Sequence, residues 1–187
     1  FVDDGSKDGS SGLLRDLESK DRRISVIHLN KHSGKTQALR SGIRQARGEI
    51  IVTMDSDLQD DPKDIPYLIQ KLKEGYGLVC GWRCQRKAGI FKAILSKIFN
   101  VVVSLITKIG LHDINCGIKA FRKEVVDKIE LYSGLHRYIP LLVYLKGYKV
   151  TEVKVNSRPR IYGRSKYGIK RYIIAGIDLF RIIISKK

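Results

Sequence analysis

The chain has 187 residues, of which 43% are hydrophobic, and this composition fits one globular domain with a real core. Its formal net charge of +17 is uneven, because residues 1–79 are balanced and residues 80–187 carry the whole excess. Such a one-sided charge points to nucleic acid, an anionic membrane or a phosphorylated substrate, and the lack of any apolar run of about 18 residues excludes a membrane-spanning helix.

The cysteines and the first residues indicate in which kind of compartment the protein works and whether the chain is complete. Cys80, Cys84 and Cys116 are an odd number without paired spacing, which argues against a disulfide framework and a zinc site and favours a reducing compartment. No signal peptide is visible. The chain opens in mid-strand by its pattern, without an initiator Met, so we expect it to be truncated.

Strand and helix signals alternate from the first residues. Phe1-Val2 predicts the end of a strand, followed by a turn-rich acidic loop and a short helix. A second strand at 25–29 leads to Gly34-Lys35-Thr36 and a helix to about residue 47. Leu29 stands where a P-loop requires its first glycine, so we reject that motif. A loop of Gly34 and Lys35 that opens a helix can still hold an anion.

The next stretch carries the clearest chemical signal. The apolar run Ile50 to Met54 predicts a strand buried on both faces, at the centre of a parallel sheet, and Asp55 and Asp57 follow it directly. Ligands of open α/β sheets lie beyond the carboxyl ends of the strands, and alternate residues of an extended chain point the same way. Asp55 and Asp57 are therefore candidates to bind one hard cation, with Gln59 as a further oxygen donor.

An acidic loop that caps the next helix is the alternative interpretation. For Asp60 and Asp61 we favour it, because Pro62 is a good first helical residue and an acid before it suits a helix N-terminus. That helix and a strand at 77–82 complete the order β-α-β-α-β-α-β, which is typical of a doubly wound α/β sheet.

After residue 82 the pattern changes to basic loops and broad apolar helices. Residues 88–110 predict a helix that is either buried in the core or lies in a membrane interface with snorkelling lysines. Residues 157–168 predict a mobile cationic loop, or else a solvated basic one, and 169–187 predict another broad apolar helix. The elements predicted between them are a strand at 118–121, a helix at 135–146 and a strand at 149–155.

In this order the pieces resemble glycosyltransferase family 2, and within it the polyprenyl-phosphate glycosyltransferases. The resemblance implies a single catalytic domain of α/β class with the GT-A fold, a mostly parallel central sheet flanked by helices, and a missing N-terminal strand. It divides the chain into a nucleotide- and metal-binding half, 1–82, and a basic half that faces acceptor and membrane, 83–187. The matching motifs are Asp3-Asp4-Gly5-Ser6, residues 30–36, Met54 to Pro62, Asp113 with Asn115-Cys116-Gly117, His136 to Pro140, and Arg160 with Gly163 to Lys166.

On the donor side, the resemblance implies that Asp3 or Asp4 contacts the nucleotide. It implies that Mg²⁺ or Mn²⁺ holds the donor diphosphate and is bound by Asp55, Asp57 and Gln59. Further donor-binding positions are Gly34, Lys35 and Ser56. A loop that closes on the donor phosphates contains Arg160, Ser165 and Lys166.

On the acceptor side, the resemblance implies that Arg83 and Lys97 receive the acceptor phosphate and that Asp113 lies beside the reacting centre. The reaction implied is inverting transfer from a UDP- or GDP-linked sugar to dolichyl or undecaprenyl phosphate. A lipid phosphate has a second pKa near ~6, so it is already a nucleophile at neutral pH and needs positioning more than a base. The protein would work at the cytoplasmic face of an anionic membrane, peripheral or anchored by segments outside this chain.

Two rival functions remain open at this point. A family 2 enzyme that acts on a sugar or protein hydroxyl would need a carboxylate base, and Asp113 could serve. A nucleic-acid-binding module would exploit the basic half, but its cations lie between long apolar helices rather than on an aromatic sheet, so we expect no nucleic acid partner.

Overall fold

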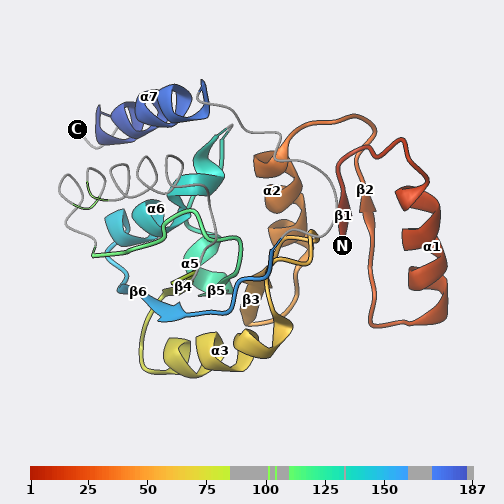
Figure 1. Cartoon of the computed structure of the whole chain (residues 1–187), viewed down its shortest axis with the longest axis horizontal. Coiled ribbons are helices and arrows are strands. Elements are labelled where there is room, and N and C mark those ends of the chain that lie inside the picture. Colours follow the sequence, from red (N-terminus) through yellow and green to blue (C-terminus); the bar gives the residue numbers. More distant parts are fainter. Residues whose placement is uncertain (85–100, 102–103, 105–109, 133, 160–169, 185–187) are drawn as a thin grey trace. The chain divides into compact units, whose positions relative to one another are not determined.

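The computed structural model describes residues 1–84, 101, 104, 110–132, 134–159 and 170–184 (Figure 1). The chain divides into two compact units. Unit 1 comprises Phe1–Arg47 and Glu130–His136, and unit 2 comprises Gly48–Ile129 and Arg137–Lys187. The predicted functional halves, 1–82 and 83–187, follow a different boundary and stay a prediction.

Unit 1 is a small strand and helix layer. Val2 pairs with Ile27 and Asp3 pairs with His28 in parallel register. The second helix packs on the first strand so closely that a Cβ at Gly42 would lie 3.1 Å from Cγ2 of Val2. Its elements are β1 (Val2–Asp3), α1 (Ser10–Lys20), β2 (Ile27–His28) and α2 (Lys35–Gln45).

Unit 2 is built on a four-stranded mixed sheet in the order β3-β5-β4-β6. Its strands are β3 (Ile50–Thr53), β4 (Leu78–Trp82), β5 (Lys119–Arg122) and β6 (Val150–Lys154). β5 pairs antiparallel with both β3 and β4, and β4 pairs parallel with β6. Therefore β5 alone runs against the other three strands, and the predicted α/β class with a mostly parallel sheet is confirmed.

The predicted central position of the strand at Ile50 to Met54 is wrong. β3 stands at one end of the strand order that the described residues form. Ile50 and Val52 pack against a core cluster that includes Leu68 and Ile118, whereas Ile51 is itself buried and is paired with the buried Phe121. A strand at the end of a sheet can thus be apolar on both faces, and its composition alone does not place it at the centre.

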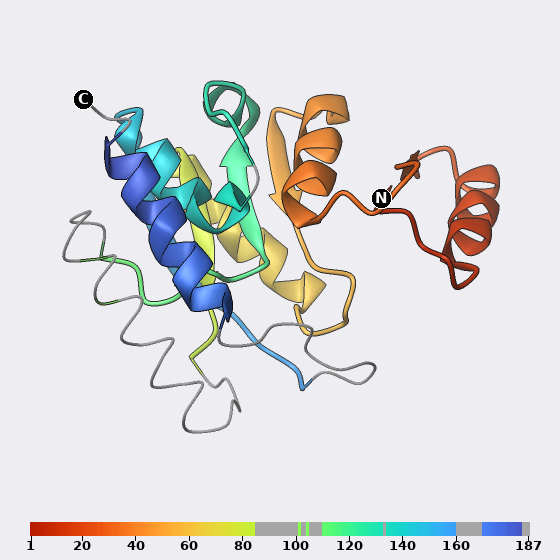
Figure 2. The ribbon, with the colours of Figure 1, turned by 90° about the horizontal axis from the view of Figure 1, so that it is seen from above.

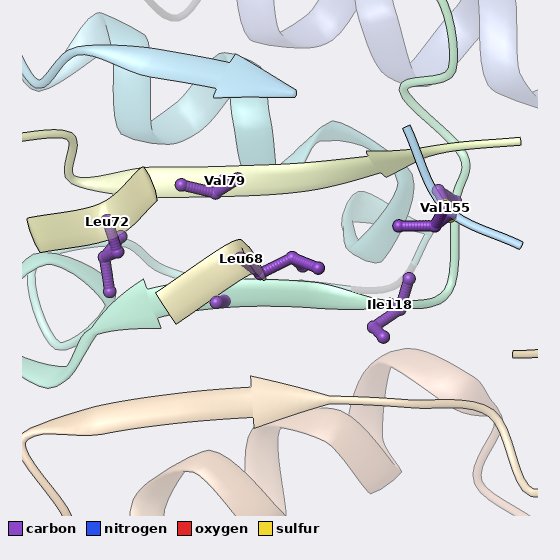
Figure 3. Close-up of a cluster of buried hydrophobic side chains, with 7 residues drawn as sticks. Leu68, Leu72, Val79, Ile118 and Val155 are labelled. Carbon is purple, nitrogen blue, oxygen red and sulfur yellow. The ribbon is translucent and has the colours of Figure 1, made fainter. Parts of the chain in front are cut away.

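Helices cover both faces of this sheet. Leu68 and Leu72 of α3 (Ile65–Lys73) are fully buried against Val79 and Ile118 on one face (Figure 3). Burial of a leucine side chain contributes about 1.5–3 kcal/mol. Figure 1 shows α6 (Ile139–Leu145) on the opposite side of the sheet from α3. Shorter helical turns are η1 (Pro62–Asp64), α5 (Lys123–Val126) and η2 (Leu135–Tyr138).

The last helix, α7 (Lys170–Ile184), lies on the same side of the sheet as α6 (Figure 1 and Figure 2). Asp178 of α7 is close enough to Tyr138, just before α6, for its charge to add to the effect of burial in raising the pKa of that phenol. The sequence predicts a broad apolar helix here, and the residues of α7 whose side chains are described fall into a buried set (residues 178, 179 and 182) and an exposed set (residues 176, 177, 180, 181 and 184). The segment predicted as a helix at 88–110 lies outside the described residues, apart from Val101, Ser104 and Gly110.

We predict that Gly81→Ala destabilises the protein. A Cβ at Gly81 would lie 2.6 Å from Cγ2 of Ile118 and 2.9 Å from both Sγ of Cys116 and Cγ2 of Val155. Over-packing of this kind costs about 1–3 kcal/mol, which urea unfolding should detect. Gly176→Ala in α7 is the matched control, because its Cβ would meet nothing within 4 Å, and it should be neutral or slightly stabilising. Equal stability of the wild type and Gly81→Ala would contradict the packing.

Candidate active site

The predicted metal-binding acids lie in the loop that follows β3. Oδ2 of the buried Asp60 accepts a hydrogen bond from the backbone N–H of Asp55 at 3.3 Å. Oδ1 of Asp57 accepts one from the N–H of Gln59 at 3.2 Å. Between them Leu58 has a left-handed φ of 61°, a strained conformation for a residue other than glycine. This turn brings Asp55, Asp57 and Asp60 together at the carboxyl end of the strand.

The closeness of these carboxylates affects the pKa of Asp60. Burial raises its pKa, the charges of Asp55 and Asp57 raise it further, and the N–H of Asp55 and the charge of Arg83 oppose the rise. The backbone at Gly117 forms one wall, since a Cβ there would lie 2.8 Å from Oδ2 of Asp55 and 2.9 Å from Oδ2 of Asp60. Like charges held this close disfavour the ionised form of Asp60. Among the described residues, no three His, Cys, Asp or Glu side chains are placed so that they alone could hold a metal ion.

The two acids predicted to cap the next helix behave differently. Asp61 caps η1, because its Oδ1 accepts a hydrogen bond from the N–H of Lys63 at 3.1 Å. The prediction is wrong for Asp60, whose carboxylate turns back toward Asp55 and belongs with the candidate site. The left-handed turn at Leu58 decides this direction, and no residue type in the sequence signals it.

The same loop is hydrogen-bonded to the segment after β6. The N–H of Arg158 donates to the carbonyl oxygen of Gln59 at 2.9 Å, and the amide Nε2 of Gln59 donates to the carbonyl oxygen of Arg158 at 3.4 Å. The Arg158 guanidinium pairs with Asp61 at 2.5 Å. The predicted metal loop and the start of the basic segment are thus one connected structure. The predicted phosphate-binding residues further along that segment, Arg160, Ser165 and Lys166, lie outside the described residues.

Arg83 and Asp113 form a bidentate ion pair. Nε of Arg83 lies 2.7 Å from Oδ2 of Asp113, and its Nη2 lies 3.1 Å from Oδ1. Their side chains are only 11% and 10% exposed. Burial alone would lower the pKa of Arg83, but the hydrogen bonds and charge of Asp113 outweigh it and raise that pKa. The sequence predicts both residues for the acceptor side but not that they bind each other, and Lys97 lies outside the described residues.

In unit 1, Asp3 is buried and fully engaged. It accepts hydrogen bonds from the hydroxyl of Ser11, from the N–H of Ser6 at 2.9 Å and from Nδ1 of His28 at 3.2 Å. These bonds, that from Ser11 foremost, lower the pKa of Asp3 well below its ordinary value. Its role in the structure is therefore to hold the loop between β1 and α1 in place.

Asp4 occupies the loop that was predicted to hold an anion. Its carboxylate accepts hydrogen bonds from the N–H groups of Ser33 at 2.7 Å and Gly34 at 2.9 Å, and it pairs with Nδ1 of His32 at 2.8 Å. Gly34 thus binds an anion, but that anion is a side chain of the protein. Lys35 is the first residue of α2, and in unit 2 the predicted donor-binding Ser56 is exposed.

Known proteins resemble this chain over most of its length. Residues 1–130 match the model of the family described as glycosyl transferase family 2. A dodecaprenyl-phosphate galacturonate synthase from Rhizobium johnstonii is 36% identical over 188 residues, covering 98% of this chain and 56% of that protein. An undecaprenyl-phosphate 4-deoxy-4-formamido-L-arabinose transferase from Pseudomonas fluorescens is 33% identical over 180 residues, covering 96% of this chain and 53% of that protein. The chain spans about half the length of the curated relatives it matches.

Solved structures share its fold. A glucosyl-3-phosphoglycerate synthase from Mycobacterium tuberculosis, in complex with Mn²⁺, UDP-glucose and phosphoglyceric acid, matches with a TM-score of 0.71 at 18% identity, over 99% of this chain and 66% of that one. A mannosyltransferase from Pyrobaculum calidifontis, in complex with GDP-Man and Mn²⁺, matches with a TM-score of 0.64 at 18% identity. The match covers 98% of this chain and 54% of that one. Together with the family match, this likeness confirms the predicted GT-A fold.

We predict that Asp3→Asn lowers the melting temperature at neutral pH and that this deficit shrinks in acid. Because the folded state lowers the pKa of Asp3, its carboxylate stabilises the fold above the unfolded value near 3.8, and this contribution is lost as the pH falls below that value. Thermal unfolding of both proteins from neutral pH to about pH 3 tests this. Asp16→Asn, an exposed site on α1, is the control. A deficit that does not change with pH would contradict the prediction.

Proposed function

The chain belongs to glycosyl transferase family 2, and we propose that it transfers a sugar from a nucleoside-diphosphate sugar to a polyprenyl phosphate with inversion at the anomeric carbon. One observation carries the proposal. The buried Arg83 lies close enough to the carboxylates after β3 for its charge to lower the pKa of Asp60. A cation-binding cluster and a phosphate-binding guanidinium are therefore neighbours, as transfer from a diphosphate to a phosphate requires. Two similar proteins that bear polyprenyl-phosphate transferase names support the same acceptor.

Mg²⁺ or Mn²⁺ fits the acids after β3. Asp55 and Asp57 offer the hard oxygen ligands that such ions take, and Gln59 adds a carbonyl oxygen. Two carboxylates suffice, because an ion of this kind usually completes its shell with substrate phosphates and water. When bound, the ion would stabilise the negative charge of the departing nucleoside diphosphate. The M. tuberculosis and P. calidifontis neighbours, in complex with Mn²⁺, support this assignment.

On the acceptor side, the proposed roles of Arg83 and Asp113 follow from their contact. The guanidinium has five N–H donors, and Nε and Nη2 face Asp113. Asp113 therefore orients the guanidinium, which binds the acceptor phosphate. A hydroxyl acceptor would instead need a carboxylate base. Both oxygens of Asp113 already accept hydrogen bonds from Arg83, which favours the phosphate acceptor over the hydroxyl acceptor.

On the donor side, we assign the nucleotide contact to Asp4. Its side chain is 20% exposed and that of Asp3 is 2% exposed, so Asp4 is the more accessible of the two. The donor is UDP- or GDP-linked, since the two neighbours were solved with one of each. Gly34, Lys35 and Ser56 stay proposed donor contacts, as do Arg160, Ser165 and Lys166 for the donor phosphates.

The proposed setting is the cytoplasmic face of an anionic membrane. On α7, Ile177, Phe180 and Ile184 are 49%, 63% and 56% exposed, and their spacing puts them on one stripe of the helix. The exposed Arg181 lies among them, and the excess positive charge of the chain lies in this half. Apolar residues beside cations suit an interfacial helix. Among the described residues, no helix is long and apolar enough to cross a bilayer.

The full-length protein, given radiolabelled nucleotide sugars and undecaprenyl or dolichyl phosphate, should move label into an organic-extractable lipid that mild acid cleaves. EDTA should abolish transfer. Asp57→Asn should do the same with an unchanged melting temperature, because it removes one ligand charge from a half-exposed loop.

Asp127→Asn, which removes an exposed acid of the same unit, is the matched control and should transfer normally. If label appears only on a sugar or protein hydroxyl, the acceptor is that hydroxyl and not a polyprenyl phosphate. Full activity in EDTA, or in Asp57→Asn, would refute the metal site.

The protein should co-sediment with vesicles rich in phosphatidylglycerol more than with phosphatidylcholine vesicles, and less at high salt. Phe180→Glu should weaken this binding, because it places a negative charge in the apolar stripe of α7. Tyr67→Glu, at an equally exposed aromatic residue of α3, is the matched control. Binding that is equal for both lipids, or that Phe180→Glu leaves intact, would contradict the assignment.

A further inference from the structure

Residues 156–158, which follow β6, lie antiparallel along residues 59–64, and we call the contacts between these two segments the clamp. The N–H of Arg158 donates to the carbonyl oxygen of Gln59 at 2.9 Å, and the side-chain amide of Gln59 donates to the carbonyl oxygen of Arg158 at 3.4 Å. Nη2 of Arg158 also lies 2.5 Å from Oδ2 of Asp61. The side chain of Asp61 is 12% exposed and that of Arg158 is 55% exposed, so a nearly buried carboxylate anchors an accessible cation.

Two further acids complete the clamp. Asp60 forms an isolated antiparallel bridge with Ser157. Asp64, which is 3% exposed, accepts hydrogen bonds from the N–H of Asn156 at 2.8 Å and from its side-chain nitrogen at 3.0 Å. Three consecutive residues after β6 are therefore each bound to the stretch of chain that follows the proposed metal ligands.

The clamp holds one side of a strained turn. Leu58 has a left-handed φ of 61°, a conformation that persists only where the surrounding structure enforces it. The next two residues, Gln59 and Asp60, both belong to the clamp. The N–H of Gln59 donates in turn to Oδ1 of Asp57 at 3.2 Å, and Asp60 accepts from the N–H of Asp55 at 3.3 Å. The clamp thus supports the turn that brings these acids together.

We infer that Arg158 is a positioning residue for the proposed metal site, and that its ion pair with Asp61 keeps the loop in the shape that binds the metal. The inference rests on the proposed function, because it takes Asp55 and Asp57 to be metal ligands. If the loop visits other shapes, its apparent affinity falls by the fraction of molecules in the competent shape. Charge alone has the opposite effect, since removal of a cation from an acidic loop strengthens its attraction for a divalent ion. The sign of the change therefore distinguishes positioning from charge.

Mn²⁺ binding to the full-length protein, measured by water-proton relaxation with UDP and separately with GDP, determines this sign. Arg158→Met removes the guanidinium and should weaken Mn²⁺ binding about threefold, within the range measured for ion pairs with an exposed partner. Arg158→Lys should recover part of the loss, because an ammonium can still pair with Asp61. Lys123→Met is the matched control, since it breaks an ion pair with the exposed Asp127 of the same unit and should leave Mn²⁺ binding unchanged.

A double mutant separates the ion pair from its two charges. Asp61→Asn keeps an oxygen that can cap η1 but loses the ion pair, so it should also weaken Mn²⁺ binding. If the ion pair positions the loop, Arg158→Met should add nothing to Asp61→Asn. If the charges act independently, their opposite effects should cancel, and the double mutant should bind Mn²⁺ like the wild type.

Hydrogen exchange tests the inference in the metal-free protein. Arg158→Met should speed exchange of the backbone amides at residues 57–60, as followed by mass spectrometry, whereas Lys123→Met should not. If exchange is unchanged, or if Arg158→Met binds Mn²⁺ as tightly as the wild type or more tightly, the inference fails and the metal site stands. If the wild type binds no Mn²⁺ with either nucleotide, the proposed metal site fails and the inference falls with it.

Discussion

The bidentate ion pair of Arg83 and Asp113 is the interaction on which the site in unit 2 depends. Both side chains are nearly buried, so removal of either would leave an uncompensated buried charge, at a cost of about 3–5 kcal/mol. The pair fastens the end of β4 to the loop before β5. That loop contains Gly117, where a side chain would collide with the carboxylates of Asp55 and Asp60. One buried contact therefore positions the guanidinium proposed to bind the acceptor phosphate and, through the loop, the glycine beside the carboxylates proposed to bind the metal.

The reversed strand β5 explains why these groups meet at all. Thr53, the last residue of β3, pairs with Lys119, the first residue of β5, in antiparallel register. The chain just before β5 therefore lies beside the chain just after β3, and the hydroxyl of Thr53 donates to the carbonyl oxygen of Gly117 at 3.2 Å. In a parallel pair the start of β5 would lie beside the start of β3, a strand length from Asp55. The single reversal in an otherwise parallel sheet thus builds the site.

The sequence predicts those parts of the site that are local. The α/β order follows from the alternation of strand and helix signals, and the position of Asp55 and Asp57 follows from the apolar run that precedes them. Two features depend on distant parts of the chain and could not be predicted: the direction of β5, and the contact of Arg83 with a residue 30 positions away. A third feature, the turn of Asp60 toward Asp55, is local, but it follows a left-handed backbone conformation at Leu58 that no residue type signals. A four-residue strand has no pattern that specifies its direction or its neighbours.

The site must keep two opposite charge requirements apart within a short distance. In the proposed function, the metal needs negative charge at Asp55 and Asp57, whereas the phosphate acceptor needs positive charge at Arg83. The charge of Arg83 already reaches Asp60, so an unrestrained guanidinium would be drawn into the carboxylate cluster and would compete with the metal. Asp113 prevents this, because its two hydrogen bonds hold the planar guanidinium in one orientation. Its negative charge also offsets that of Arg83, which lowers the cost of keeping a cation buried until an acceptor phosphate binds.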